Sequence, residues 1–149
     1  MPDLKYIDSH YLIDRIDEAF TVRNPKWYDD MPFSEFCDYL LPYRVGTEEL
    51  EDWFTDYHSI FGYALDSLSQ DKEVSLHDFC LAVNKLFLEP HSGYTNYPYN
   101  KPSPRPSSLV HIIGGTCEDY LGLFSYIGRS YGIPVAQDYT PPSGSVLYR

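Results

Sequence analysis

Gly114-Gly115-Thr116-Cys117-Glu118-Asp119-Tyr120-Leu121 is the stretch that says most about the fold, and the segment that it opens ends at Gly132-Ile133-Pro134. Thr116 is suited to cap a helix N-terminus, and acidic residues in the following turn are stabilised by the positive end of the helix dipole. A glycine followed closely by a proline is a typical helix stop. The segment therefore predicts a helix with Cys117 in its first turn and an end near Gly132.

The helical period places Cys117 on the apolar side of this helix. The positive end of a helix favours the thiolate form of a cysteine in the first turn. We therefore expect the sulfur to face the elements on which the helix packs. The cysteine shares its stripe with Tyr120, Leu121, Phe124, Ile127 and Tyr131, and the opposite face carries Asp119, Gly122 and Arg129.

The same segment resembles the cysteine-helix signature of the transglutaminase-like superfamily over about residues 114–135. The resemblance lies in Gly115-x-Cys117-x-Asp119, in Leu121 and Leu123, and in Arg129-x-x-Gly132-Ile133-Pro134. In that papain-like α+β fold a buried helix holds a nucleophilic cysteine against an antiparallel sheet, which supplies a histidine and an aspartate or asparagine. The resemblance implies that Cys117 is catalytic, that a protein or peptide amide is the substrate, and that no cofactor is needed.

The order of the histidines departs from the family pattern. The family's histidine and acid follow the cysteine, whereas His111 is the histidine nearest to Cys117 and precedes it by six residues. A histidine in an apolar run is more often a hydrogen-bonded core residue than a base. The other histidines also precede the cysteine; they are His10, His58, His77 and His91.

We therefore expect a fragment that ends before the strands with the base and the acid, and that shows no turnover alone. The expected fold is mainly α in this chain and α+β in the parent protein, which would be a peptidase, an amidase or an acyl transferase. The alternative is a non-catalytic protein- or glycan-binding module of the same fold, in which the cysteine is a remnant.

Residues 1–90 form the predicted acidic helical region. Helical spacing of apolar residues predicts helices at about 8–23, 35–41, 48–69 and 75–88. In the first helix, the apolar stripe opposite Asp14, Asp17 and Glu18 is expected to face the core. That stripe consists of Leu12, Ile13, Ile16, Ala19 and Phe20.

Residues 91–149 are predicted to hold a loop, the cysteine helix and the first strand or strands of a truncated core. Residues 89–108 contain five prolines and little periodicity, so they form either a functional loop or a linker. Residues 109–113 predict a strand or a buried lead-in, and residues 135–139 alternate like a strand. The candidate substrate-binding residues are Tyr94, Tyr97 and Tyr99, whose rings could instead pack over the helices.

Composition argues against several other classes of function. The net charge of −11 arises in residues 1–90, which contain 19 acidic and 7 basic residues. A surface of this charge repels nucleic acid. No apolar run is long enough to span a membrane, and residues 1–5 do not resemble a signal peptide, so the compartment stays open. Three widely spaced cysteines predict neither a disulfide framework nor a metal site, and Cys37 and Cys80 are expected to be small core residues.

Overall fold

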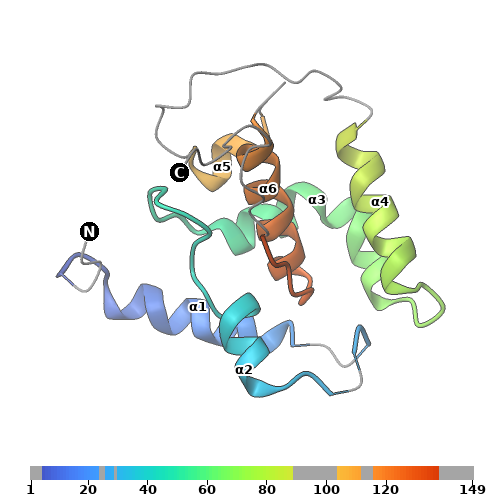
Figure 1. Ribbon diagram of the computed structural model, residues 1–149, viewed down its shortest axis with the longest axis horizontal. Helices are drawn as coiled ribbons and strands as arrows, with labels where there is room; N and C mark the ends of the chain where they lie inside the picture. The colour runs from blue at the N-terminus through green and yellow to red at the C-terminus, as the bar shows by residue number, and fades with distance from the viewer. Residues whose placement is uncertain (1–4, 24–25, 29, 89–103, 112–115, 138–149) are drawn as a thin grey trace, which may run out of the picture.

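A computed structural model describes residues 5–23, 26–28, 30–88, 104–111 and 116–137 of the 149-residue chain (Figure 1). This part of the chain is helical and contains no strand, which confirms the prediction of a mainly α chain. Residues 135–137 are not a strand, and the rest of that predicted strand lies outside the described residues. The elements are α1 (Ser9–Thr21), α2 (Phe33–Glu35), the π-helical η2 (Phe36–Leu40), α3 (Trp53–Gln70), α4 (Leu76–Leu88), α5 (Pro106–Leu109) and α6 (Cys117–Ser130).

Helix α6 lies at the centre of the molecule and packs against α3 and α5, while α3 also packs against α4 (Figure 1). The inward residues of α3 recur every four positions, at Trp53, Tyr57, Phe61 and Leu65, and so form one stripe. The sequence regions 1–90 and 91–149 thus contribute to the same core. The other buried members of this cluster are Trp27, Phe79, Val83, Leu109, Leu123, Tyr126, Ile127, Tyr131 and Ile133.

The segment before α3 is not helical, although the sequence predicted a helix from residue 48. The buried carboxylate of Glu48 accepts hydrogen bonds from the backbone N–H groups of Val45 at 2.7 Å and Gly46 at 2.8 Å. It also accepts one from the hydroxyl of Tyr126 in α6. These bonds hold residues 45–48 in a turn, so α3 begins only at Trp53.

Helix α1 is rotated relative to the prediction. Arg15 and Ala19 are its buried residues, whereas Ile13, Ile16 and Phe20 of the predicted core stripe are exposed. The Arg15 guanidinium lies over the rings of Tyr11 and Trp53, with 5.3 and 6.0 Å between the guanidinium carbon and the ring centroids. It pairs with Glu18 at 2.8 Å and Asp52 at 3.1 Å. These ring contacts and the two carboxylate partners of Nη2 hold the arginine side of α1 inward.

The helix predicted at 35–41 is present as α2 and η2. The amide of Leu41 bonds to the carbonyl of Phe36 at 3.0 Å, a five-residue step that widens the turn. Cys37 lies half-buried beside the second hydrophobic cluster, to which Phe36 belongs. Cys80 is exposed, so the expectation of a core position was wrong, because the inward positions of α4 are Phe79 and Val83.

Candidate functional site at Cys117

Cys117 is the first residue of α6, as the sequence predicted. The Thr116 hydroxyl accepts a hydrogen bond from the Asp119 amide at 3.2 Å, and the Asp119 carboxylate accepts one from the Thr116 amide at 2.8 Å. This reciprocal arrangement is a capping box, which satisfies two backbone donors at the helix start. The capping box fixes the position of the Cys117 backbone at the start of α6.

The side chain of Cys117 is exposed and belongs to neither hydrophobic cluster, so its predicted inward orientation is wrong. The face predicted to be outward is also buried, at Asp119, Gly122 and Arg129, while Ile127 and Tyr131 of the predicted inward stripe lie in the core. At Gly122 an added Cβ would lie 3.4 Å from the Leu109 side chain, so α5 packs closely there. The polar residues on this face are tolerated inside because each of them finds partners.

Arg129 is a buried polar residue whose guanidinium donates hydrogen bonds to three backbone carbonyl groups. Its Nε donates to the carbonyl oxygen of Tyr39 at 3.0 Å, and its Nη1 donates to those of Pro42 at 3.1 Å and Arg44 at 2.9 Å. Burial lowers the pKa of the Arg129 guanidinium, but an arginine still carries its proton at neutral pH. The side chain thereby ties the segment 39–44 to α6.

The end of α6 is held by the Gly132-Ile133 pair. Gly132 has φ +71°, and an added Cβ would lie 1.9 Å from the carbonyl oxygen of Val22, so a glycine is required. The Ile133 amide donates to the carbonyl of Gly128 at 2.7 Å, and the Ile133 side chain is buried in the core. The Trp27 indole donates to the carbonyl of Tyr131 at 2.9 Å, which anchors this end further.

His58 contacts α6 at the end opposite to Cys117. Its Nε2 lies 2.8 Å from the carbonyl oxygen of Ser130, and its Nδ1 lies 3.4 Å from an Asp66 oxygen that also accepts a bond from Tyr131. The fourteen residues of α6 separate the two ends by about 20 Å. His58 is therefore not a base for Cys117.

The remaining candidates are not brought to the cysteine by the described structure. His111 is exposed in the turn after α5, and no hydrogen bond joins it to Cys117 within the described residues. His91, Tyr94, Tyr97 and Tyr99 lie outside the described residues. No group of acidic, histidine or cysteine side chains suited to a metal ion occurs in the described ranges. None of the helices there has the length and apolar character needed to cross a bilayer.

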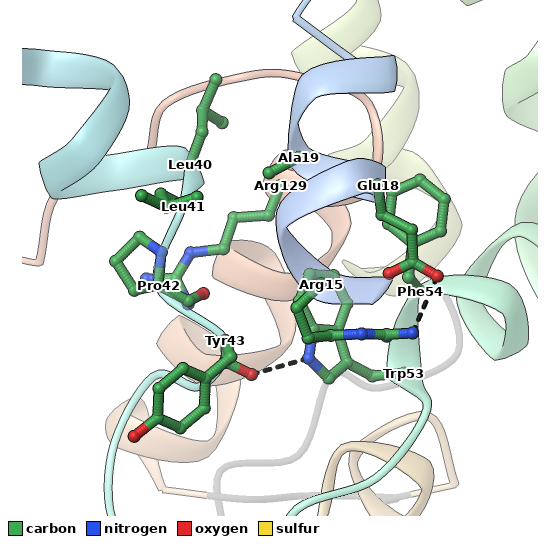
Figure 2. Close-up of a pocket in the computed structure, with 10 residues that line it drawn as sticks. All are labelled: Arg15, Glu18, Ala19, Leu40, Leu41, Pro42, Tyr43, Trp53, Phe54 and Arg129. Carbon is green, nitrogen blue, oxygen red and sulfur yellow. Dashed lines mark hydrogen bonds and ion pairs between the residues drawn. The ribbon is translucent and has the colours of Figure 1, made fainter. Parts of the chain in front are cut away.

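A small cavity lies between α1, the segment 40–43 and the start of α3 (Figure 2). Its volume of about 10 Å³ suits one water molecule rather than a substrate. Arg15 Nε and Nη1 and Glu18 Oε2 are buried there without a hydrogen-bond partner. Burial raises the pKa of Glu18 to about 7, and the nearby Asp52 charge adds to this although Arg15 opposes it.

The pair of Arg15 and Glu18 at this cavity was not predicted from the sequence, because the charged residues of α1 were expected on the outside. The available signal was spacing: Arg15 lies four residues before Ala19, on the stripe of α1 that is buried.

No protein-family model, curated protein or solved structure matches the chain, so an assignment of function depends on the residues and geometry around Cys117.

Proposed function

We propose that Cys117 is the nucleophile of a transglutaminase-like thiol enzyme that acts on amide bonds of proteins or peptides. The observation that carries the proposal is that the residues of the cysteine-helix signature differ in role: three of them stabilise the fold and the cysteine does not. Asp119 caps α6, Arg129 ties down the segment 39–44, and Gly132 permits the turn after the helix. Cys117 alone among these residues is exposed. A structural role therefore accounts for the other three signature residues but not for the thiol.

The position of Cys117 suits nucleophilic attack. The first backbone N–H groups of a helix have no carbonyl partner within the helix, and such groups stabilise both a thiolate and an oxyanion. The thiolate sulfur would attack the amide carbonyl carbon and form a C–S bond. The C–N bond then breaks, the amine leaves with the proton that the family's histidine took from the thiol, and the resulting thioester passes its acyl group to water or to another amine.

The proposal needs a base and an orienting acid beyond the described residues, as in the α+β fold of the family. In that scheme a histidine takes the proton of the thiol and an aspartate orients the histidine. Tyr94, Tyr97 and Tyr99 are proposed to contact the peptide beside the cysteine. The 149-residue chain alone is expected to form a thioester slowly and to show no amide turnover.

The competing proposal is a protein- or glycan-binding module in which Cys117 is a remnant. The observation in its favour is that, within the described residues, no histidine is hydrogen-bonded to Cys117. The two proposals differ in the reactivity that they assign to this thiol.

The test is acylation of the folded chain by p-nitrophenyl acetate, followed by mass spectrometry of each cysteine. The thiolate displaces p-nitrophenolate, which leaves with the electron pair of the ester bond, and the acetyl group stays on sulfur. Cys80 is an internal control, because it is exposed but partial burial raises the pKa of its thiol. We expect Cys117 to be acetylated at least tenfold faster than Cys80 and Cys37 at neutral pH, corresponding to about 1.4 kcal/mol. Equal rates would favour the binding module.

A further inference from the structure

Four large apolar side chains are exposed together on α1 and α2. Ile13 is 54% exposed, Ile16 42%, Phe20 47% and Phe33 60%. Ile13, Ile16 and Phe20 follow one another at three- and four-residue steps, so they lie on one side of α1. The rings of Phe20 and Phe33 both contact that of Phe36, with centroids 4.8 and 5.9 Å away, which joins the two elements. We call these four exposed residues the α1 patch.

The α1 patch lies on the side of α1 that faces away from the rest of the described chain. The inward side of the helix is occupied by Arg15 and Ala19, so the most apolar side of α1 is left facing outward. Figure 1 shows α1 and α2 together at one end of the molecule, away from α4. A contiguous exposed apolar surface rimmed by polar residues is typical of an interaction site.

The rim of the α1 patch is acidic. Asp14 and Asp17 are exposed on α1 beside the apolar stripe, and Glu35 and Asp38 are exposed on α2 and η2 beside Phe33. None of the four forms an ion pair with the described part of the chain. The nearby cation, Arg23, donates to the carbonyl of Met31 and lies over the Phe36 ring. The surroundings of the patch thus carry four carboxylates and this one guanidinium, so their net charge is negative.

We propose that the α1 patch binds an amphipathic helix of a partner protein whose polar flanks are rich in lysine and arginine. The apolar side of that helix would cover the four exposed side chains, and its cations would lie beside Asp14 and Asp17. Helix α1 has 13 residues and is about 20 Å long, so a partner helix of about four turns matches it.

The acidic rim favours a cationic helix over two other possible occupants, a second copy of the chain and an anionic membrane surface. In a second copy of the chain the same acidic rim would meet itself, and like charges raise the free energy of such a contact. An anionic membrane surface would be repelled by a chain of net charge −11. A cationic helix alone gains from both the apolar and the acidic parts of the surface.

The probe is a synthetic peptide of leucine and lysine, about four helical turns long, with leucine at every third and fourth position. Its partner probe carries glutamate in place of each lysine. Titration calorimetry on the full chain should give binding of the lysine peptide alone, weakened by added salt. Ile16→Asp should weaken that binding at least tenfold, and the double variant D14K/D17K at least threefold.

The matched control is Tyr63→Asp on α3, which changes an 82% exposed aromatic residue away from the α1 patch and should leave the dissociation constant unchanged. Circular dichroism checks that each variant is folded. The proposal is overturned if the glutamate peptide binds equally well, or if Tyr63→Asp weakens binding as much as Ile16→Asp. It is also overturned if neither peptide binds at millimolar concentration, or if Ile16→Asp instead abolishes self-association or vesicle binding.

Discussion

The carboxylate of Asp119 accepts a hydrogen bond from the backbone N–H of Thr116 at 2.8 Å, and this bond closes the first turn of α6 around Cys117. Asp119 is 6% exposed, whereas Cys117, two residues away, is exposed. The aspartate of the signature therefore serves to position the helix start. The cysteine contributes nothing to the core and is accessible to a reactant.

Replacing Arg129 with methionine should lower the free energy of unfolding by about 3 kcal/mol, the scale for removing one partner of a buried charged hydrogen-bond set. The carbonyl oxygens of Tyr39, Pro42 and Arg44 would lose their donor. Urea unfolding followed by circular dichroism measures the change. The control is Lys85→Met on the exposed side of α4, which should stay within about 0.5 kcal/mol of the wild type. Similar values for both variants would show that Arg129 does not anchor the segment 39–44.

Gly132→Ala should destabilise the chain by at least about 2 kcal/mol, since strain at positive φ adds to a backbone clash. The new Cβ would lie 1.9 Å from the carbonyl oxygen of Val22, and φ is +71°. Gly122→Ala, inside α6, is the matched control, because its Cβ would lie 3.4 Å from a side-chain carbon of Leu109, which is an ordinary contact distance. Alanine within a helix also gains about 0.5–1 kcal/mol over glycine. Melting temperatures should therefore fall clearly for Gly132→Ala alone, and equal losses would contradict the assigned turn.

Local signals in the sequence were enough to place α6. Thr116 and Gly132 act on their own neighbours, through the capping box and the positive φ, so both ends of the helix could be predicted. The orientation of the helix could not, because Arg129 is satisfied by carbonyl groups 85–90 residues away. A helical wheel treats such a residue as a surface residue.

The same limit explains the errors at α1 and α3. Arg15 faces inward because Trp53 and Asp52, far along the chain, lie against its guanidinium. The turn before α3 depends on a carboxylate, that of Glu48, which also reaches Tyr126 in α6. At the candidate site the cysteine and its helix position were predictable from the sequence, whereas the exposure of the thiol followed from these distant contacts.

Glu18 should make the stability of the chain depend on pH. Burial raises the pKa of Glu18 from 4.5 to about 7, so between these values the folded chain binds a proton that the unfolded chain has released. The stabilising contribution is complete below about pH 4.5 and is lost as the pH rises through about 7. Glu18→Gln should remove this loss, whereas Asp17→Asn, on the exposed side of α1, should retain it. Urea midpoints between pH 4 and 8 measure the slopes. An unchanged slope in Glu18→Gln would mean that Glu18 does not titrate in this range.

The capping box should control the reactivity of Cys117, and two substitutions of Asp119 should act in opposite directions. Asp119→Asn keeps a side-chain acceptor for the Thr116 amide and removes a negative charge near the thiol. Removing a negative charge two residues from the thiol favours an anion there, so iodoacetamide should alkylate Cys117 a few-fold faster at neutral pH. Asp119→Ala removes the acceptor, frays the first turn at a cost of about 1 kcal/mol, and should slow the reaction, because Cys117 is then no longer held at an ordered helix start. Mass spectrometry resolves the rate at each cysteine, with Cys37 and Cys80 expected to stay unchanged in both variants. If both substitutions speed the reaction equally, charge alone governs the thiol and the helix start has no part in it.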